Sequence, residues 1–221
     1  MIRTLVFDYD GTIHNTKHLY GNAFRKAYDF LVNEGFAEDR VYTDEETSIY
    51  LGLSAPEMWE KFMPDLPGDV KKTASSIIGE SMDSLVYEGQ AVLFDGVEET
   101  LQLLKDKGYK MAILSNCRVS YINAHREVFG LDKWFDAYYP AEKYNFIPKE
   151  EIFPEIANVF PGEYIIIGDR YKDIKTAICH DLLSIGCTFG FCDDGELAKA
   201  SVLVNKFSEI PEVIENLEKN N

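Results

Sequence analysis

The chain has 221 residues, of which 46% are hydrophobic and 27% charged, and its formal net charge at pH 7 is −16. Nucleic acids and anionic membranes bind proteins through clustered lysine and arginine side chains, so a surface this acidic excludes both as partners. No hydrophobic run approaches the roughly 20 residues of a membrane-spanning helix, and we expect no signal peptide. The composition is that of a globular protein with one sizeable core and a smaller second domain. Nothing in it indicates an obligate protein partner.

The cysteines lack the spacing of a zinc site or of a disulfide framework. No Cys-x-x-Cys pair occurs, and the four histidines are scattered along the chain. Isolated cysteines are typical of reduced thiols, which predicts a cytoplasmic location. The four are Cys117, Cys179, Cys187 and Cys192.

The first predicted element is a buried strand over Ile2–Phe7, in which successive residues are hydrophobic rather than alternating. That pattern is typical of a strand covered on both faces, as in a parallel sheet. Residues 15–89 lack such strands and contain amphipathic stretches, including Ala23–Asn33 and Val70–Tyr87, divided by the turn-rich segment Pro64–Gly68. We expect residues 15–89 to form a helical insertion.

After residue 89 the chain alternates between helix and strand patterns. Such alternation predicts an open α/β sheet with right-handed crossovers. The expected helices are Val97–Lys107, Glu151–Val159 and Asp173–His180, and the expected strands are Lys110–Leu114, Phe135–Tyr139, Tyr164–Ile167, Ser184–Thr188 and Val202–Val204. The predicted fold class is therefore α/β, with a Rossmann-like parallel sheet formed by residues 1–14 and 90–221.

Two acids follow the first strand, in the run Asp8-Tyr9-Asp10-Gly11-Thr12. Ligands of an open parallel sheet bind outside the carboxyl ends of its strands, where both acids would lie. Carboxylates at i and i+2 favour a divalent cation, and glycine allows a sharp turn that brings backbone N–H groups toward a ligand. The alternative is an ordinary Asp-Gly turn after a strand.

Polar residues also follow two later strands. Ser115 and Asn116 end one strand and can donate hydrogen bonds to an anionic oxygen, although a helix cap or turn would have the same sequence. Asp169 ends another strand, and Asp173 follows four residues later, where it could equally be a helix N-cap. Because the three strands share one sheet edge, chance placement of all these groups is much less probable than chance placement of one.

Taken together, these motifs make the chain resemble the haloacid dehalogenase-like hydrolase superfamily, over nearly its whole length. The branch that it resembles most is the phosphoglycolate-phosphatase-like one, in which a helical cap is inserted after the first motif. The resemblance implies a catalytic core of residues 1–14 and 90–221 and a cap domain of residues 15–89.

The resemblance also implies a mechanism: magnesium-dependent hydrolysis of a small phosphorylated metabolite, a phosphomonoester, through an aspartyl-phosphate intermediate. Asp8 matches the nucleophile and Asp10 the general acid/base, and a second carboxyl group beside a carboxylate nucleophile can carry the proton. Ser115 matches the residue that hydrogen-bonds the transferred phosphoryl group. The ligands that the resemblance implies for Mg²⁺ are Asp8, Asp10 through its carbonyl, Asp169 and Asp173.

One motif departs from the family pattern. The family has a lysine, often followed by proline, shortly before the third of these strands, but Ile147 stands before Pro148 here. We assign the lysine role to Lys149, because it lies just before the predicted helix, and retain Lys143 as the alternative. The first motif has Asn15 where the family commonly has an acid, which affects substrate contacts more than catalysis.

We expect the substrate to contact Gly11, Thr12, Asn116, Arg118 and Ser54. Further candidates in the insertion are Tyr20, Tyr50, Glu57 and Trp59, although most of these aromatic residues are expected to pack the interior of the insertion. His14 is expected to contact the hinge or the cap rather than to act as a base.

Two other functions fit the same fold. A phosphosugar mutase would share every acid of the core and would differ only in its cap contacts and products. A non-catalytic binding domain would require the loss of a catalytic acid, and all four acids are present.

Overall fold

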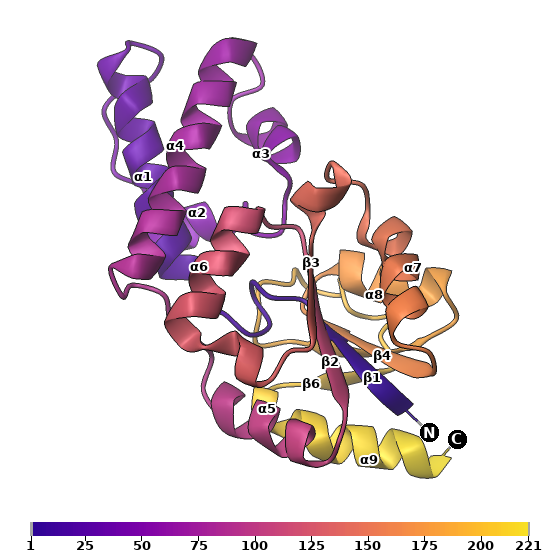
Figure 1. Ribbon diagram of the computed structural model, residues 1–221. Helices are drawn as coiled ribbons and strands as arrows, with labels where there is room; N and C mark the ends of the chain where they lie inside the picture. The colour runs from indigo at the N-terminus through magenta and orange to yellow at the C-terminus, as the bar shows by residue number, and fades with distance from the viewer. Residues whose placement is uncertain (1, 221) are drawn as a thin grey trace.

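The computed structural model describes residues 2–220, and within them a parallel sheet of six strands forms the centre of the molecule (Figure 1). The strand order is β3-β2-β1-β4-β5-β6, so β1 lies between β2 and β4. The strands are β1 (Ile2–Phe7), β2 (Lys110–Ser115), β3 (Ala137–Pro140), β4 (Glu163–Gly168), β5 (Leu183–Cys187) and β6 (Val202–Val204).

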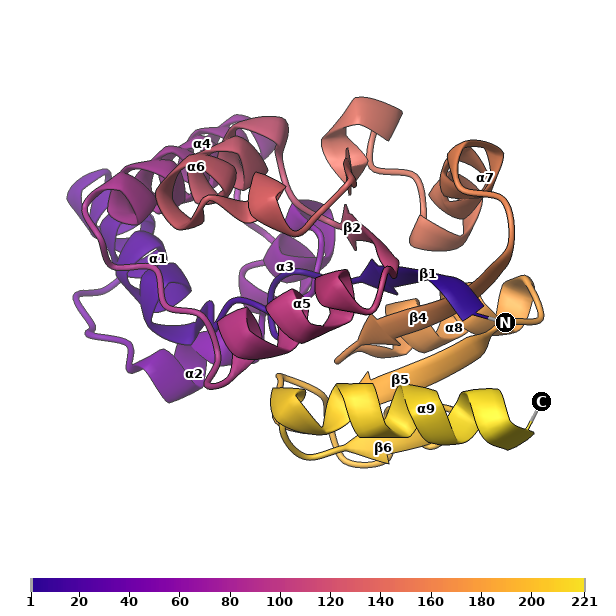
Figure 2. The same cartoon turned by 60° about the horizontal axis from the view of Figure 1, so that its bottom comes forward.

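Helices cover both faces of the sheet, because successive residues of the central strands face opposite sides (Figure 2). Leu5 and Phe7 pack into one hydrophobic cluster, which includes residues of α5 and α9. Val6 packs into a second cluster with residues of α7 and α8. The helices are α5 (Val97–Asp106), α6 (Val119–Phe129), α7 (Lys149–Val159), α8 (Tyr171–Cys179) and α9 (Ile210–Asn220).

Four helices between β1 and α5 form an insertion beside the carboxyl edge of the sheet (Figure 1). Its two longest helices, α1 and α4, pack against each other. An aromatic group fills its interior, where Phe24 stacks on Tyr28 and Tyr50 and meets Phe62 edge-on. The helices are α1 (Lys17–Asn33), α2 (Asp44–Ser48), α3 (Ala55–Phe62) and α4 (Gly68–Tyr87).

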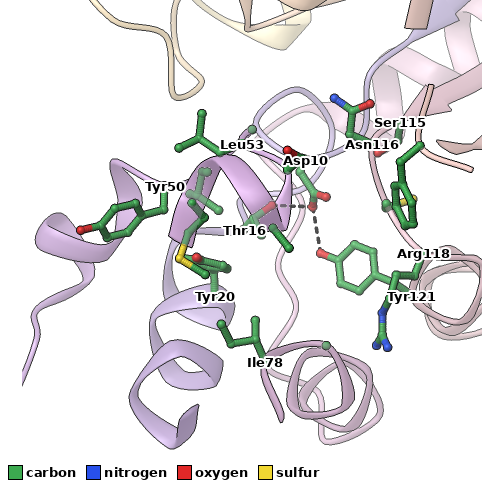
Figure 3. A pocket seen from close by; sticks show the side chains of 18 of the residues that line it. Asp10, Thr16, Tyr20, Tyr50, Leu53, Ile78, Ser115, Asn116, Arg118 and Tyr121 are labelled. Atoms are coloured by element: carbon green, nitrogen blue, oxygen red, sulfur yellow. Dashed lines mark hydrogen bonds between the residues drawn. The ribbon is translucent and has the colours of Figure 1, made fainter. Parts of the chain in front are cut away.

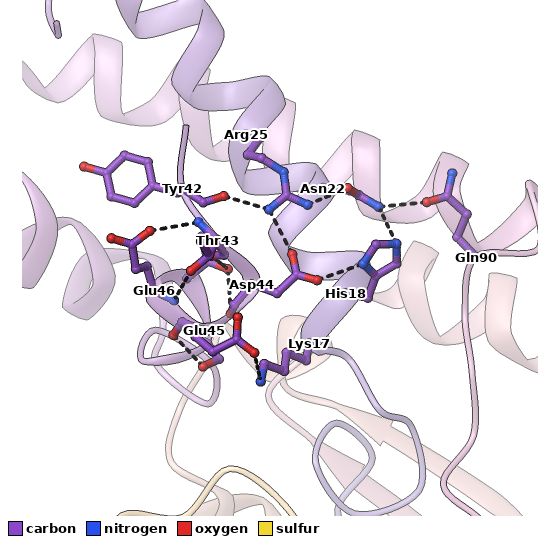
Figure 4. Close-up of polar contacts among 12 residues, drawn as sticks. Lys17, His18, Asn22, Arg25, Tyr42, Thr43, Asp44, Glu45, Glu46 and Gln90 are labelled. Atoms are coloured by element: carbon purple, nitrogen blue, oxygen red, sulfur yellow. Dashed lines mark hydrogen bonds and ion pairs between the residues drawn. The ribbon is translucent and has the colours of Figure 1, made fainter. Parts of the chain in front are cut away.

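The two connections between the insertion and the sheet run side by side. The backbone N–H of Asn15 donates to the carbonyl of Val92 at 2.9 Å, and that of Phe94 donates to the carbonyl of Ile13 at 3.0 Å. A polar network lies next to them, in which Asp44 accepts hydrogen bonds from Arg25 and pairs with His18 (Figure 4). The insertion thus leaves and re-enters the core at one place.

The α/β fold with a parallel sheet is confirmed, and each predicted strand overlaps an observed one. The predicted bounds of β1 and β6 agree with the structure, whereas β3 begins two residues later than expected. Helix α6 was not predicted, because Tyr121 and His125 occupy buried positions on it and hide the hydrophobic period. Helix α9 was also missed. Short 3₁₀ helices occupy Leu131–Lys133, Ala141–Tyr144 and Phe207–Glu209.

Two further predictions concern location. Among the residues described, none of the helices has the length and hydrophobicity of a membrane span. All four cysteines are free thiols, so no disulfide argues against the predicted reducing environment, and the cytoplasmic location stays a prediction.

Candidate active site

Three neighbouring strands bring the predicted site residues to one edge of the sheet. β1 ends just before Asp8, β4 just before Asp169, and β2 at Ser115. The backbone N–H of Asp8 continues the sheet by donating to the carbonyl of Ile167 at 2.8 Å. Because β1 lies between the other two strands, Asp8 occupies the middle of this edge.

Three carboxylates with little exposure to solvent meet there. Asp8, Asp169 and Asp173 each offer an oxygen within 4.8 Å of the other two, and all three side chains are buried. The only lysine nitrogen found against this group within residues 2–220 is Nζ of Lys149, at 2.7 Å from Asp8 and 2.6 Å from Asp173. Three acids and one base leave an excess of buried negative charge.

The pKa values of these groups reflect that excess. Burial and the charge of Asp173 raise the pKa of Asp8 to about 7, although Lys149 opposes the shift. Burial, Asp8 and Asp173 raise the pKa of Asp169 well above its usual value. Burial lowers the pKa of Lys149, but its two carboxylate partners outweigh burial and raise it overall. Carboxylate oxygens suit a hard divalent cation, which would offset the repulsion, so the donor set fits a metal ion.

Of the two candidate lysines, Lys149 reaches the acids and Lys143 does not. Lys149 is 4% exposed and begins α7 directly after Pro148, whereas Lys143 lies exposed in the preceding 3₁₀ helix. Asn145 and Phe146 both have left-handed φ angles, 55° and 57°, which turn the chain between the two lysines. Non-glycine residues seldom adopt this conformation, and they do so chiefly where the surrounding structure requires it.

Gly11 and Thr12 support Asp169 and do not line the cavity described below. A Cβ atom on Gly11 would lie 2.1 Å from Oδ2 of Asp169, which is too close for any side chain. The φ angle of Gly11, +84°, is also one that residues with a side chain rarely adopt. The hydroxyl of Thr12 donates to Oδ1 of Asp169, and the backbone N–H of Phe191 donates to Oδ2. Thr12 was expected to contact the substrate. Because its side chain is fully buried and bonded to Asp169, a role in orienting Asp169 fits it better.

Asp10 is held on one oxygen by three side chains. Oδ1 accepts hydrogen bonds from the hydroxyls of Thr16 at 2.6 Å and Tyr121 at 2.8 Å, and lies 3.0 Å from Nδ1 of His14 (Figure 3). Oδ2 takes part in none of these bonds. Burial raises the pKa of Asp10, but the contacts with His14 and Thr16 outweigh it, so the pKa is lowered overall.

A second buried histidine lies behind this group. Nδ1 of His125 is 2.7 Å from the hydroxyl of Tyr9, and the His125 and His14 rings meet at an angle with their centres 4.5 Å apart. Burial lowers the pKa of His125 to about 3, so its ring is neutral at physiological pH. His14 thus contacts Asp10 on one side and His125 of α6 on the other. The sequence analysis missed Tyr121 and His125 because it did not predict α6.

A cavity of about 610 Å³ opens from this edge toward the insertion (Figure 3). Its core side includes Asp8, Asp10, Ser115 and Lys149, and its far side consists of insertion residues. The predicted residues Asn116, Arg118 and Ser54 line it as well, together with Tyr20 and Tyr50, whereas Glu57 and Trp59 are not among its lining residues.

Several of the expected substrate contacts already have partners within the protein. The guanidinium of Arg118 pairs with Asp83 of α4 at 2.8 Å, and the Ser54 hydroxyl donates to Glu57 at the start of α3. Trp59 is buried and donates from its indole nitrogen to Ser75, so it packs the insertion as expected.

Comparison with known proteins places the chain in a known class of enzymes. A profile of the family described as haloacid dehalogenase-like hydrolase matches residues 5–186. The chain belongs to this family, and the predictions of the family and of the hydrolase class are confirmed.

Proteins whose sequences align with this chain over almost its full length include several named pyrophosphatase. The chain is 26% identical to pyrophosphatase PpaX of Listeria monocytogenes serotype 4b, with 98% of both chains covered. It is 24% identical to pyrophosphatase PpaX of Bacillus pumilus, with 96% of both covered.

Solved structures show the same fold. A predicted phosphatase from Clostridium acetobutylicum superposes with a TM-score of 0.82 at 21% identity, covering 98% of this chain and 99% of that one. CbbY from Rhodobacter sphaeroides in complex with phosphate superposes with a TM-score of 0.76 at 20% identity, covering 95% of this chain and 96% of that one.

Proposed function

We propose that this protein is a Mg²⁺-dependent phosphohydrolase that cleaves a phosphomonoester of a small metabolite through a phosphorylated Asp8. The observation that carries the proposal is the surroundings of Asp8. This carboxylate lies at the cavity edge, paired with Lys149 at 2.7 Å, with Asp10 two residues further along the chain. Family membership and the names of the relatives support the same class of reaction.

The proposed reaction has two steps, each using one of these acids. An oxygen of Asp8 attacks phosphorus and the bond from phosphorus to the substrate oxygen breaks, while Asp10 donates a proton to that leaving oxygen. Water then attacks the phosphorus of phosphorylated Asp8, Asp10 takes the proton from water, and inorganic phosphate leaves. The single-sided hydrogen bonding of Asp10 leaves Oδ2 available for both proton transfers.

Binding of the phosphoryl group is assigned to residues that ring Asp8. The ammonium of Lys149 and the polar groups of Ser115 and Asn116 line the cavity on this side and can hold the phosphoryl oxygens. Asp8, Asp169, Asp173 and the carbonyl of Asp10 would hold Mg²⁺, which would neutralise charge on the phosphoryl group.

We assign residues 15–89 as a cap domain over a core formed by residues 1–14 and 90–221. Met1 and Asn221, at the two ends of this core, lie outside the described part of the chain. Polar contacts of three basic side chains help to join the two parts around the cavity. The guanidinium of Arg170 donates to the carbonyl of Leu51, Lys172 pairs with Glu57 at 2.9 Å, and Arg118 pairs with Asp83. Breaking and remaking them would admit the substrate and then exclude water.

The test is release of inorganic phosphate from p-nitrophenyl phosphate with and without Mg²⁺, with Asp8→Asn beside the wild type. We expect metal-dependent release that the substitution abolishes. Activity that persists in Asp8→Asn would overturn the assignment of the nucleophile. A mutase would convert a phosphosugar into its isomer in place of releasing phosphate, and the products distinguish the two enzymes.

A further inference from the structure

The half of the cavity that faces away from Asp8 is lined by hydrophobic side chains of the insertion. Tyrosine, aliphatic and thioether side chains contribute to the lining on this side. Figure 3 shows Tyr20 and Ile78 beside the space next to Tyr121, while the ring of Tyr50 points away from that space and stacks on Phe24. These side chains come from α1, from the segment that follows α2, from α3 and from α4. The hydrophobic residues of the insertion that line the cavity are Tyr20, Tyr50, Leu51, Leu53, Ala55, Pro56, Met58, Ile78 and Met82.

The basic side chains at the cavity already have acidic partners. Arg118 pairs with Asp83 at 2.8 Å, and Lys172 pairs with Glu57 at 2.9 Å. Arg170 pairs with Glu196 at 2.9 Å, and Lys149 is held by two of the buried acids. Among the described residues that line the cavity, every lysine and arginine is therefore ion-paired, and the hydrophobic half has no unpaired cation.

An anionic leaving group would bind poorly in such a place. Hydrolysis of pyrophosphate releases a second phosphate ion, which would have to give up its hydration among tyrosine, leucine and isoleucine side chains without a compensating cation. A volume of about 610 Å³ falls within the range that holds drug-sized ligands. The phosphate ester of a two-carbon alcohol would leave most of this hydrophobic surface unfilled.

We propose that the alcohol portion of the substrate is a bulky apolar or aromatic group, and that pyrophosphate and phosphates of very small alcohols are poor ligands. The inference rests on the proposed function for the position of the phosphoryl group, which lies beside Asp8. Selectivity then follows from burial of the apolar group against Tyr20, Leu53 and Ile78. The PpaX relatives carry the name pyrophosphatase, so this chain would differ from them in the compound that it hydrolyses.

The test is calorimetric binding of ethyl-, butyl- and hexylphosphonate in the presence of Mg²⁺, with methylenediphosphonate as the analogue of pyrophosphate. These compounds are not hydrolysed, and within the alkyl series only the buried apolar length changes. Full burial of one methylene is worth up to about fourfold in affinity. We therefore expect hexylphosphonate to bind at least about tenfold more tightly than ethylphosphonate, and methylenediphosphonate to bind less tightly than hexylphosphonate. Equal affinities along the series, or tightest binding of methylenediphosphonate, would overturn the inference.

A pair of leucine variants locates the effect. Leu53→Ser removes apolar surface from the cavity wall, and we expect it to reduce the dependence on chain length to less than about half. Leu103→Ser changes a leucine that is 45% exposed on α5, away from the cavity, and should leave the series unchanged. A full dependence on chain length in Leu53→Ser would place the hydrophobic contact elsewhere and contradict the proposal.

Binding and turnover separate this inference from the proposed function. Tight binding of hexylphosphonate together with failure to hydrolyse hexyl phosphate would overturn the phosphohydrolase proposal and uphold the hydrophobic site. Hydrolysis of ethyl and hexyl phosphates with equal kcat/KM, together with flat binding, would uphold the phosphohydrolase and overturn the inference.

Discussion

The two halves of the cavity differ in charge, in hydrophobicity and in the elements that supply their side chains. The core half is charged and rigidly supported, with Asp8, Asp169 and Lys149 buried and in contact with one another or with backbone N–H groups. The insertion half is hydrophobic, and its side chains come from helices and connections outside the sheet. Under the proposals made above, the sheet edge would carry out the reaction and the insertion would recognise the substrate.

The largest effect is expected from removing the negative charge of Asp169 in the charged half of the cavity. Asp169→Asn removes one of three mutually repelling carboxylates, so it should abolish stabilisation by Mg²⁺ while leaving the metal-free protein no less stable. We expect kcat to fall about 10³-fold, because the charge stabilisation lost with a metal ion is several kcal/mol. Thermal unfolding with and without Mg²⁺ measures the first effect, with the exposed Asp29→Asn as control. An unchanged response to Mg²⁺ would show that Asp169 does not hold the ion.

Removing the buried cation should destabilise the protein itself. Lys149→Met leaves Asp8 and Asp173 without their ammonium partner, which is expected to cost about 3–5 kcal/mol of unfolding free energy in metal-free protein. Lys143→Met, on an exposed side chain, should change stability by no more than about 0.5 kcal/mol. Urea titrations of both variants measure the difference, and similar losses in the two would contradict the assignment of the family lysine to Lys149.

Protons should compete with metal for the same acids. Because burial and Asp173 raise the pKa of Asp8 to about 7, Asp8 becomes protonated as the pH falls through that value, and a protonated carboxyl binds cations weakly. We expect the affinity for Mg²⁺ to fall as the pH drops below about 7, and protonation of Asp169, whose pKa is also raised, adds to the loss. Calorimetric titrations across this range give the profile, and an affinity that is constant from pH 6 to pH 8 would refute it.

The smallest effect concerns the pKa of Asp10. Tyr121→Phe removes one of the three contacts on Oδ1, and a hydrogen bond donated to the carboxylate favours its ionised form, so the pKa of Asp10 should rise. The acid limb of the pH profile for hydrolysis of phosphorylated Asp8 should therefore move to higher pH. Tyr87→Phe, which removes an exposed hydroxyl bound to Glu127, serves as the matched control. A lower rate with an unmoved acid limb would assign Tyr121 a purely structural role.

The charged half could be predicted from sequence far better than the hydrophobic half. Strand ends are visible in the chain, and parallel strands meet at one edge, so the convergence of Asp8, Ser115 and Asp169 followed from the order of elements. The choice of Lys149 over Lys143 needed only its position beside Pro148 and just before the predicted helix. These signals are local, and a single sequence contains them.

The remaining contacts depend on packing between segments far apart in the chain. Tyr121 reaches Asp10 across 111 positions, from a helix whose hydrophobic period is masked by polar aromatic residues. Thr12 looked like a ligand contact because it follows the motif, but its direction toward Asp169 depends on the turn at Gly11. The lining of the insertion side likewise depends on how α1, α3 and α4 pack, which periodicity alone does not specify.

The paired connections at Asn15 and Val92 have a consequence for protein engineering. Because the two ends of the insertion are hydrogen-bonded to each other at 2.9 Å, a short loop could join them without stretching the first strand of the sheet. If Thr16 is kept in place on Asp10, we expect the rest of the segment to be exchangeable for a foreign one as a single cassette. A library of such exchanges would change which compounds are accepted while the same sheet edge is retained.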